Sequence, residues 1–512
     1  MLTVVRTLLL VLALLLGLLL VTALLSRRAL PPRGPVAQSE ARTGLADTTL
    51  ARSLAAEIAA HPGLSGIHPL ADGHDAFAAR AALADAAERR IDAQYYIWHN
   101  DTAGRLLLQH LRRAADRGVH VRLLLDDNNT AGLDPLLRGL DAHPQIEVRL
   151  FNPLMHRRLR VLNYLSDFNR AHRRMHNKSF TVDGQVTVVG GRNVGDEYFG
   201  AGAGVMFADL DVSAIGPVVA AVEADFERYW TSPSAYPLTA IVTDPEQVDV
   251  GTVPADDAAT QRYRVTIANS SLVRHLHAGS LPLVWAPTRL VSDDPAKVLG
   301  QVADDDTLMA PLFQAMESAR HELTIISPYF VPTQVGTDAL TQLAASGVKV
   351  EVLTNALSAT DVAAVHTGYA RYREALLRGG VKLYELKRSA TVVASGHGGV
   401  TGSSGASLHA KTFTVDGHQI FVGSFNMDPR SARLNTEMGL LIDSAELADQ
   451  LQSGLAAMAG TAAYAVTLEQ GHLRWTTQEG GQTVTEDSEP QTSWWRHLSV
   501  QVMSWLPIEW LL

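Results

Sequence analysis

The sequence predicts an α/β protein made of two similar repeats, each a mixed sheet flanked by helices and related to the other by a pseudo-twofold axis. Three observations predict this fold. The phrase "HNKSFTVDG" that begins at His176 recurs as "HAKTFTVDG" at His409, 233 residues later. Segments with helical periodicity alternate with short apolar segments, which is the pattern of sheets covered by helices. A chain of 512 residues is also long enough for two domains of ordinary size.

The same series of helix, strand, helix and strand is predicted in both halves. In the first half these segments span 75–90, 91–98, 105–118 and 119–127. In the second half they span 310–322, 323–332, 338–347 and 348–356. In both halves the second helix ends at a Gly that opens a Gly-Val-x-Val strand, a helix stop followed by a β-branched run. The two repeats are therefore expected to share one topology.

The duplication divides the chain into four parts. We expect a membrane anchor and linker at 1–35, the first repeat at 36–270, the second repeat at 271–465 and a Trp-rich tail at 466–512. The boundary between the repeats is placed in a stretch rich in turn formers and acids. Four of the eight Trp residues fall in the last 19 positions. Such a tail suits the water–lipid interface, and packing on the protein body is the alternative.

The N-terminal segment differs from the rest of the chain. Residues 7–25 carry no charge over 19 positions, close to the roughly 20 that a helix needs to cross a bilayer. A single-pass anchor in the cell (inner) membrane is therefore predicted, with a cleaved signal peptide as the alternative. The Arg residues on its two sides favour a cytoplasmic body only slightly.

The composition narrows the functional classes. Apolar residues make up 46% of the chain, which is typical of a globular protein with some membrane character. A net charge of −10 argues against a dedicated nucleic-acid binder, because phosphate backbones are bound by basic surfaces. The chain has no cysteine, which excludes disulfides and metal sites built from thiolates.

The repeated phrase predicts a hairpin that carries chemical groups. On a strand, His176 and Lys178 lie on one face because side chains alternate. Asp183 and Gly184 are typical of a type I′ turn, and the strand that follows returns the chain to Asn193.

The second copy matches the first position by position. His409 and Lys411 precede a turn at Asp416, and Asn426 follows His409 by 17 residues, the same separation as in the first copy. One such hairpin is more often an ordinary surface feature, but two matched copies indicate a site. If the copies pack about a twofold axis, two His, two Lys and two Asn residues converge on one pocket.

The convergent set predicts phosphodiester chemistry. Lysine ammonium and asparagine amide groups are donors for phosphoryl oxygens and can neutralise their charge without a metal. Histidine titrates near pH 6.5, so one imidazole can be neutral and nucleophilic while its twin is protonated and acts as an acid. The set predicts two displacements through a phosphohistidine. No cofactor or metal is expected.

The sequence resembles a known superfamily. The pattern H-x-K-x-x-x-x-D occurs twice, followed by "GGRN" and "GSFN", and resembles the phospholipase D superfamily over roughly residues 70–465. The segments "QYYIWHND", "LLLDDNNTAGLD" and "LPIEWLL" are similar to its bacterial cardiolipin synthase branch. The resemblance implies transfer of a phosphatidyl group to phosphatidylglycerol, with phosphatidylethanolamine as a further candidate substrate.

The resemblance also implies roles for individual residues. His176 and His409 would be the nucleophile and the acid/base pair, in an order that the sequence does not decide. The groups that would bind the phosphate are Lys178, Lys411, Asn193 and Asn426.

Four acids complete the expected site. An acid after each Asn is expected to hold the histidine of its own repeat in one tautomer. Glu437 fits this role in the second repeat, 28 residues after His409, and Asp209 is the better candidate in the first repeat. Asp183 and Asp416 lie at turns and are expected to be structural.

Rival functions share these residues. A phospholipase D would use water in the second step and release phosphatidic acid, and a nuclease of the same superfamily would cut nucleic acid.

Before the first motif, residues 155–174 hold six Arg among apolar residues. This segment is predicted either to lie on anionic lipid or to be a solvated helix face.

Overall fold

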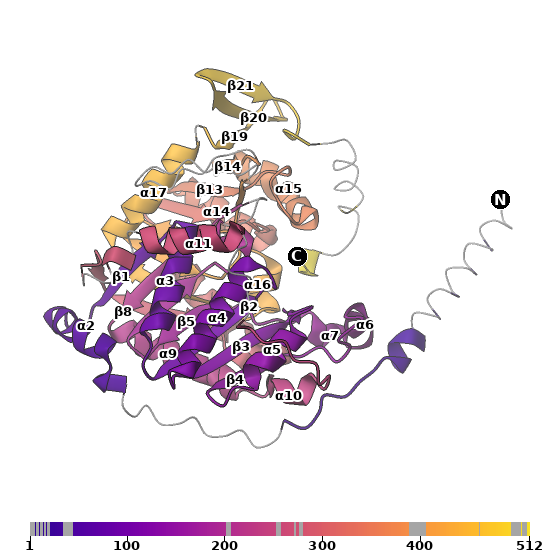
Figure 1. Cartoon of the computed structure of the whole chain (residues 1–512). Coiled ribbons are helices and arrows are strands. Elements are labelled where there is room, and N and C mark those ends of the chain that lie inside the picture. The colour runs from indigo at the N-terminus through magenta and orange to yellow at the C-terminus, as the bar shows by residue number, and fades with distance from the viewer. Residues whose placement is uncertain are drawn as a thin grey trace.

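A computed structural model gives the fold of the chain. Apart from a few single positions, it describes the residues 21–33, 45–200, 206–251, 258–270, 273–275, 280–388, 406–459, 461–492 and 509–511. The described residues form two large mixed sheets, one two-stranded sheet and helices around them (Figure 1).

The first sheet has nine strands in the order β10-β1-β8-β6-β5-β2-β3-β4-β9. Its strands are β1 Ser65–Leu70, β2 Arg90–Ile97, β3 His120–Asn129, β4 Ile146–Phe151, β5 Ser179–Val182, β6 Val186–Gly190, β8 Asp211–Ile215, β9 Ala235–Pro237 and β10 Val284–Ala286.

The second sheet has ten strands in the order β11-β18-β17-β16-β12-β13-β14-β19-β20-β21. Its strands are β11 Thr288–Ser292, β12 Glu322–Ile326, β13 Lys349–Asn355, β14 Lys382–Leu386, β16 Thr412–Val415, β17 Gln419–Gly423, β18 Met438–Asp443, β19 Ala463–Glu469, β20 His472–Glu479 and β21 Gln482–Glu486.

The two sheets repeat one topology. Starting from β1 and from β11, eight successive strands occur in equivalent order. The directions match as well: β2, β3 and β4 are parallel, as are β12, β13 and β14, and the other neighbours in each series are antiparallel. The predicted α/β architecture of two similar repeats is confirmed.

Helices cover the outer faces of both sheets and also contribute side chains to the layer between them. The α-helices are α2 Thr49–Ala60, α3 Gly73–Ala86, α4 Thr102–Asp116, α5 Asp134–Asp141, α6 Val161–Ser166, α7 Phe168–Ala171, α8 Asp196–Phe199, α9 Pro217–Thr231, α10 Leu238–Ile241, α11 Ala258–Asn269, α13 Met309–Glu317, α14 Thr333–Ala345, α15 Ala363–Arg378, α16 Pro429–Arg433 and α17 Ala445–Ala459. Within the described residues, four short 3₁₀ helices are η1 Leu45–Asp47, η2 Pro295–Leu299, η3 Asp304–Asp306 and η4 Glu509–Leu511.

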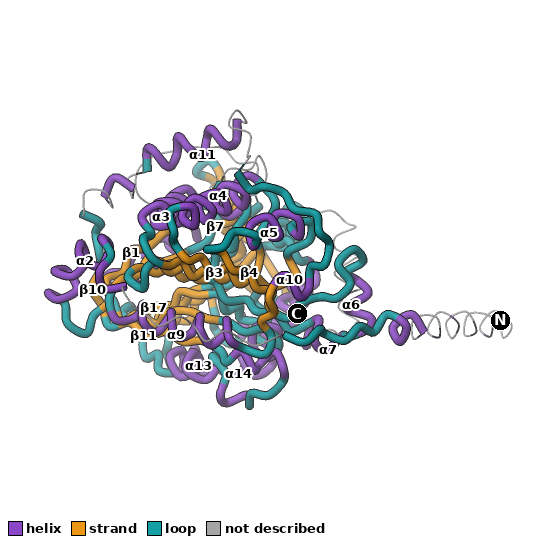
Figure 2. The backbone as a smooth tube through the Cα atoms, turned by 60° about the horizontal axis from the view of Figure 1, so that its bottom comes forward, coloured by secondary structure: helices purple, strands orange, loops and turns teal. Residues whose placement is uncertain are grey.

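The two repeats pack face to face through a shared apolar layer. In Figure 2 the strands lie between α3, α4 and α11 on one side and α13 and α14 on the other. Val189 and Val212 of the first sheet and Ile420 and Leu440 of the second belong to one buried cluster between the sheets. Because burial of such side chains removes apolar area from water, this interface between the two sheets is part of the hydrophobic core.

Three predicted chain segments differ from the structure or lie largely outside the described residues. The strand predicted at 323–332 ends at Ile326, because Pro328 cannot donate to a central ladder. Within the segment predicted as a tail at 466–512, β20 and β21 extend the second sheet. Among the described residues no helix is both long and apolar enough to span a membrane, and most of 7–25 lies outside those residues.

Candidate active site

The two hairpins adopt the predicted turn. Asp183 and Gly184 have φ values of 50° and 63°, and Asp416 and Gly417 have 48° and 65°, the positive values that a type I′ turn requires. The Asp183 carboxylate accepts hydrogen bonds from the amides of Glu88, Arg89 and Arg90. The Asp416 carboxylate does the same for Arg320, His321 and Glu322. Both aspartates therefore hold the turn against the start of the adjacent strand.

The His-x-Lys segments lie just before the hairpin strands. The expectation that His and Lys stand on the strand itself is wrong, because β5 begins only at Ser179 and β16 at Thr412. The backbone of each segment pairs with the other repeat instead. The His176 amide donates to Thr436 O at 2.9 Å, and the His409 amide donates to Ala208 O at 2.8 Å.

The pairing between repeats is extended on both sides of the twofold. The residues before His409 form β15 Ala406–Leu408, which runs parallel to β7 Met206–Ala208. The residue before His176 forms an isolated parallel bridge with Thr436. Each histidine segment is thus placed beside the residues that precede the acid of the opposite repeat.

Each histidine is held by the acid of the opposite repeat. The distance from His176 Nδ1 to Glu437 Oε2 is 2.7 Å, and that from His409 Nδ1 to Asp209 Oδ2 is 2.5 Å. All four side chains are buried. The expectation that each acid serves its own repeat is wrong, because the cross-repeat backbone pairing sets each acid opposite the partner's histidine. The structure thus corrects the expected pairing, and the catalytic roles of these four residues stay a prediction.

The two acid sites differ in one detail. Ser424 donates its hydroxyl to Glu437 Oε2 at 2.5 Å. The matching position in the first repeat is Gly191, where an added Cβ would lie 2.2 Å from Asp209 Oδ1. The shorter acid therefore approaches the backbone at a position that only glycine allows. The longer acid is bound by a serine there.

Both lysines turn back to the histidines. Lys178 Nζ donates to His176 O at 2.5 Å, and Lys411 Nζ donates to His409 O at 2.5 Å. Burial lowers the pKa of Lys178 to about 7 and the pKa of Lys411 to about 8. A phosphate between them would favour the protonated form of both, because an opposite charge favours the charged state.

The imidazoles lie in one positive cluster. Burial, together with the charges of Lys178 and Lys411, lowers the pKa of His176 well below its ordinary value. Burial and Lys411 also lower the pKa of His409. The expected contrast between a neutral and a protonated histidine is therefore not set by the protein's own charges. A bound anion would favour the protonated form of either imidazole, because an opposite charge favours the charged state.

The acids respond differently to the same cluster. Burial raises the pKa of Glu437 to about 7. Burial also opposes ionisation of Asp209, but the charge and hydrogen bond of His409, with Lys411, hold the pKa of Asp209 below its ordinary value. The Asp209 carboxylate is thus ionised at neutral pH, while Glu437 is close to its midpoint.

The two predicted asparagines are placed unequally. Asn193 accepts a hydrogen bond from Ile97 N at 3.1 Å and donates to the Tyr198 hydroxyl at 3.0 Å. The side-chain oxygen of Asn426 is buried without a hydrogen-bond partner. Asn193 therefore braces the first repeat, whereas Asn426 keeps an unpaired polar atom, the kind of feature that calls for a functional explanation.

Aromatic side chains that the sequence argument did not select surround the imidazoles. The ring of Tyr96 lies edge-on to His176 with centroids 4.8 Å apart. Tyr198 and Phe207 contact His409 at 5.2 and 5.0 Å. No spacing in the sequence marks these residues, because they come from three separate segments.

Asp293 is a further residue that the sequence argument missed. Its carboxylate is buried and accepts from the Glu437 amide at 2.9 Å and from Lys297 Nζ at 2.8 Å. It also accepts from Leu308 N at 2.8 Å. Asp293 therefore positions the backbone of the acid that holds His176.

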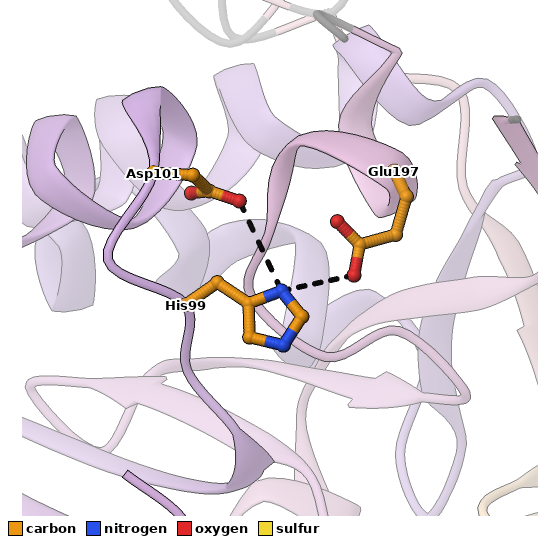
Figure 3. Close-up of side chains that lie close together, drawn as sticks. All are labelled: His99, Asp101 and Glu197. Atoms are coloured by element: carbon orange, nitrogen blue, oxygen red, sulfur yellow. Dashed lines mark ion pairs between the residues drawn. The ribbon is translucent and has the colours of Figure 1, made fainter. Parts of the chain in front are cut away.

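Among the residues that the structure describes, one cluster brings together three side chains of the types that bind metals. The ligand atoms of His99, Asp101 and Glu197 lie within 4.8 Å of one another (Figure 3). His99 Nδ1 pairs with Glu197 at 3.0 Å. Asp101 already accepts from the amides of Gly104 at 2.9 Å and Asp196 at 2.7 Å. These contacts account for the group as a hydrogen-bonded turn.

Two copies of one α/β unit, joined by crossed histidine–acid pairs, define the pseudo-dimeric class of phospholipase D-type proteins. A family model described as "Cardiolipin synthase, PLD-like domain" matches residues 81–230 and 312–459. The chain belongs to this family.

Similar proteins extend the comparison. Cardiolipin synthase C of Escherichia coli K12 is 52% identical over 88% of this chain and 97% of its own length. An uncharacterized protein of Helicobacter pylori J99 is 31% identical over 90% of this chain and 92% of its own. The crystal structure of phosphatidylserine synthase from Haemophilus influenzae Rd KW20 has a TM-score of 0.56, covers 91% of this chain and all of its own, and is 14% identical. The last likeness concerns the fold.

Proposed function

We propose that this protein is a phosphatidyltransferase that moves a phosphatidyl group onto phosphatidylglycerol and forms cardiolipin. The observation that carries the proposal is the buried cluster of two crossed histidine–acid pairs and two lysines. The 52% identity to cardiolipin synthase C over nearly all of both chains supports the choice of substrate.

The first step uses both histidines. Nδ1–H of each imidazole donates a hydrogen bond to its acid, so each imidazole presents Nε2 to the substrate. Nε2 of one histidine forms a bond to phosphorus as the P–O bond to the leaving alcohol breaks. The other histidine, protonated once the anionic phosphodiester is bound, gives its proton to the leaving oxygen.

The second step reverses these roles. The histidine that gave its proton takes one from a hydroxyl of phosphatidylglycerol. The oxygen of that hydroxyl then bonds to phosphorus as the P–N bond breaks. Lys178, Lys411 and Asn426 donate to the phosphoryl oxygens, whose charge increases in each transition state. No metal or cofactor takes part in this proposal.

The surface around α6 and α7 supports action at a membrane. Leu159, Val161, Leu165 and Phe168 have exposed side chains there. An exposed cluster of large apolar side chains is typical of an interaction site. The segment lies just before His176 in the chain, so the surface is close to the active site.

The arginines of this segment are used inside the protein. Arg157 pairs with Asp127 and Asp134. Arg170 pairs with Asp167 at 2.5 Å and donates to Asn152 at 2.9 Å. We therefore propose that the apolar side chains, more than these arginines, contact lipid.

We also propose that residues 7–25 form a single-pass anchor. The carbonyl of Ser26, which follows this segment, accepts a hydrogen bond from His156 Nε2 at 2.5 Å. His156 precedes α6, so the chain leaves the body next to the apolar surface (Figure 1). An anchor there would hold that surface on the bilayer.

A lipid assay tests the function. The purified protein is mixed with phosphatidylglycerol, with and without phosphatidylethanolamine, and the products are analysed by mass spectrometry. Cardiolipin is the expected product. Phosphatidic acid without cardiolipin would mean a phospholipase D, and cleavage of DNA without lipid turnover would mean a nuclease.

Variants and chelation test the mechanism. His176→Ala and His409→Ala should each abolish turnover, and full activity of either variant would contradict the shared site. EDTA should leave the rate unchanged, and strong inhibition would contradict the metal-free steps. A ³²P-labelled intermediate mapped to one histidine would identify the nucleophile.

A further inference from the structure

A cavity of about 690 Å³ lies beside the candidate active site, in the second repeat. Its walls come from α13, the start of α14, α15 and the segment from Phe425 to Arg433, and η4 contributes Glu509 and Trp510. Met309, Phe313, Val331 and Met427 give it an apolar lining. Its volume falls within the range of about 300–1,000 Å³ that is usual for ligand pockets.

The cavity shares a wall with the catalytic loop. Phe425 and Met427 both line it, and Asn426 lies between them in the chain. Asp428 also lines it, and the charge of this carboxylate helps to raise the pKa of Lys411 against the larger effect of burial. A molecule in the cavity is therefore separated from the phosphate-binding groups by the thickness of one loop.

The C-terminal helix η4 covers the cavity through polar contacts. Glu509 pairs with Arg371 at 2.7 Å and accepts from the Tyr372 hydroxyl at 2.9 Å. The carbonyl of Leu511 accepts from Arg430 at 3.3 Å. Arg371 and Glu509 are partly exposed, and exposed ion pairs contribute little, so this cover can be displaced.

The cover continues the apolar surface of the first repeat. The ring of Trp510 is 50% exposed and lies 6.1 Å from that of Phe168 on α7. Phe168 belongs to the exposed apolar surface around α6 and α7. The cavity therefore lies where a lipid entering from that surface would meet the protein.

We propose that this cavity binds one acyl chain of the phospholipid substrate and that η4 is its cover. The inference rests on the proposed function, because it assigns a subsite to the same lipid. The apolar lining matches a hydrocarbon chain, and an apolar cavity is a poor site for ordered water. The charged side chains that line the cavity are both basic and acidic, so the apolar side chains, and not a net charge, carry this inference.

A chain-length experiment tests the subsite. The kcat/KM of the full-length protein is measured with phosphatidylglycerol that carries sixteen-carbon or six-carbon acyl chains, both in the same mixed micelles. Met309→Trp fills the cavity, and Ala310→Trp adds the same ring at the neighbouring, exposed position of α13. Met309→Trp should lower the long-to-short ratio at least tenfold, while Ala310→Trp should keep the wild-type ratio.

The tenfold threshold is modest. Each fully buried methylene changes binding by about fourfold, or about 0.8 kcal/mol, so loss of two methylene contacts would exceed it. An unchanged ratio in Met309→Trp would overturn the acyl-chain subsite. Absence of cardiolipin from wild type with either lipid would instead contradict the proposed function.

Photolabelling gives an answer even if Met309→Trp fails to fold. Wild-type protein is irradiated with phosphatidylglycerol that carries a diazirine near the end of one acyl chain, and labelled peptides are mapped. Label in the peptides around Met309 or around Met427 is expected, and excess unlabelled phosphatidylglycerol should remove it. Label confined to other peptides would overturn the proposal.

Discussion

Glu437→Gln is the sharpest test of the crossed pairing. Gln has nearly the same volume, so the buried packing is kept while the negative charge is lost. The carboxylate of Glu437 accepts from His176 Nδ1 at 2.7 Å and from Ser424 at 2.5 Å. Both bonds end on the same oxygen, Oε2, so a Gln oxygen in that place can accept from both partners, but it carries no negative charge to stabilise a protonated His176.

The expected loss follows from the charge that is removed. Hydrogen bonds to charged groups contribute about 1.5–3 kcal/mol and neutral ones about 0.5–1.5 kcal/mol, so the neutral acceptor should cost about 1–1.5 kcal/mol, which corresponds to about five- to tenfold in kcat. A carboxamide that presents its NH₂ group to Nδ1 would also select the wrong tautomer of His176 and add to the loss.

The pH profile should change with the residue. Because burial raises the pKa of Glu437 to about 7, the wild-type carboxyl is ionised above that pH and protonated below it. The wild-type rate should therefore fall as the pH drops through about 7. Glu437→Gln mimics the protonated carboxyl, so its own profile should lack this step.

Two measurements and one control variant test whether Glu437 pairs with His176. The kcat of cardiolipin formation is compared for wild type, Glu437→Gln and Glu446→Gln, which removes an exposed charge from α17 of the same repeat. Nitrogen-15 NMR of labelled histidines should show the change at His176. An unaltered rate, or a shift at His409 with His176 unchanged, would refute the crossed pairing.

Three further predictions concern single residues. Lys178→Met should abolish turnover yet raise stability by about 2–4 kcal/mol below pH 7, since burial lowers the pKa of Lys178 to about 7 and folding then confines a charge. The unfolded chain binds the proton up to its ordinary pKa, so this gain should shrink as pH rises from 7 toward 10.5 in chemical denaturation, and a gain independent of pH would be inconsistent with it. Gly191→Ala should displace Asp209, whose Oδ1 would lie 2.2 Å from the new Cβ, and lower kcat at least tenfold; wild-type kinetics would show that the close approach is unnecessary. Asp183→Ala should cost about 1.5–3 kcal/mol in urea unfolding because three backbone amides lose their acceptor, with kcat per folded molecule kept within threefold; a specific loss of kcat would instead make Asp183 catalytic.

Local patterns predicted the parts of the fold that depend on neighbouring residues. The turn at Asp183 and Gly184 follows from backbone preferences of those two residues, and its positive φ values confirm it. The strand at 91–98 was placed within one residue, since β2 spans Arg90–Ile97. The start of the strand near Lys178 was not predicted correctly. The pairing between β5 and β6 begins only at Ser179, one residue after Lys178.

Contacts between the repeats were beyond local patterns. Glu437 was selected because it is an acid that follows Asn426 in the second repeat, but its partner is the histidine of the first repeat, 261 residues away. Tyr96 and Asp293 support the site through contacts that come from separate segments. No spacing along one chain reveals which of two equivalent histidines an acid will face.

The sequence by itself determined that there are two α/β repeats, that each carries a His-x-Lys segment and a tight turn, and which residues could handle a phosphodiester. These features depend on residue type and on periods of two or 3.6 residues, which are local properties. The tertiary structure alone decided that the acids exchange partners, that both imidazoles have lowered pKa values and that the chain neighbours of Asn426 line an apolar cavity. The physical reason is that pairing, burial and electrostatic interaction depend on which surfaces meet when the two sheets pack face to face.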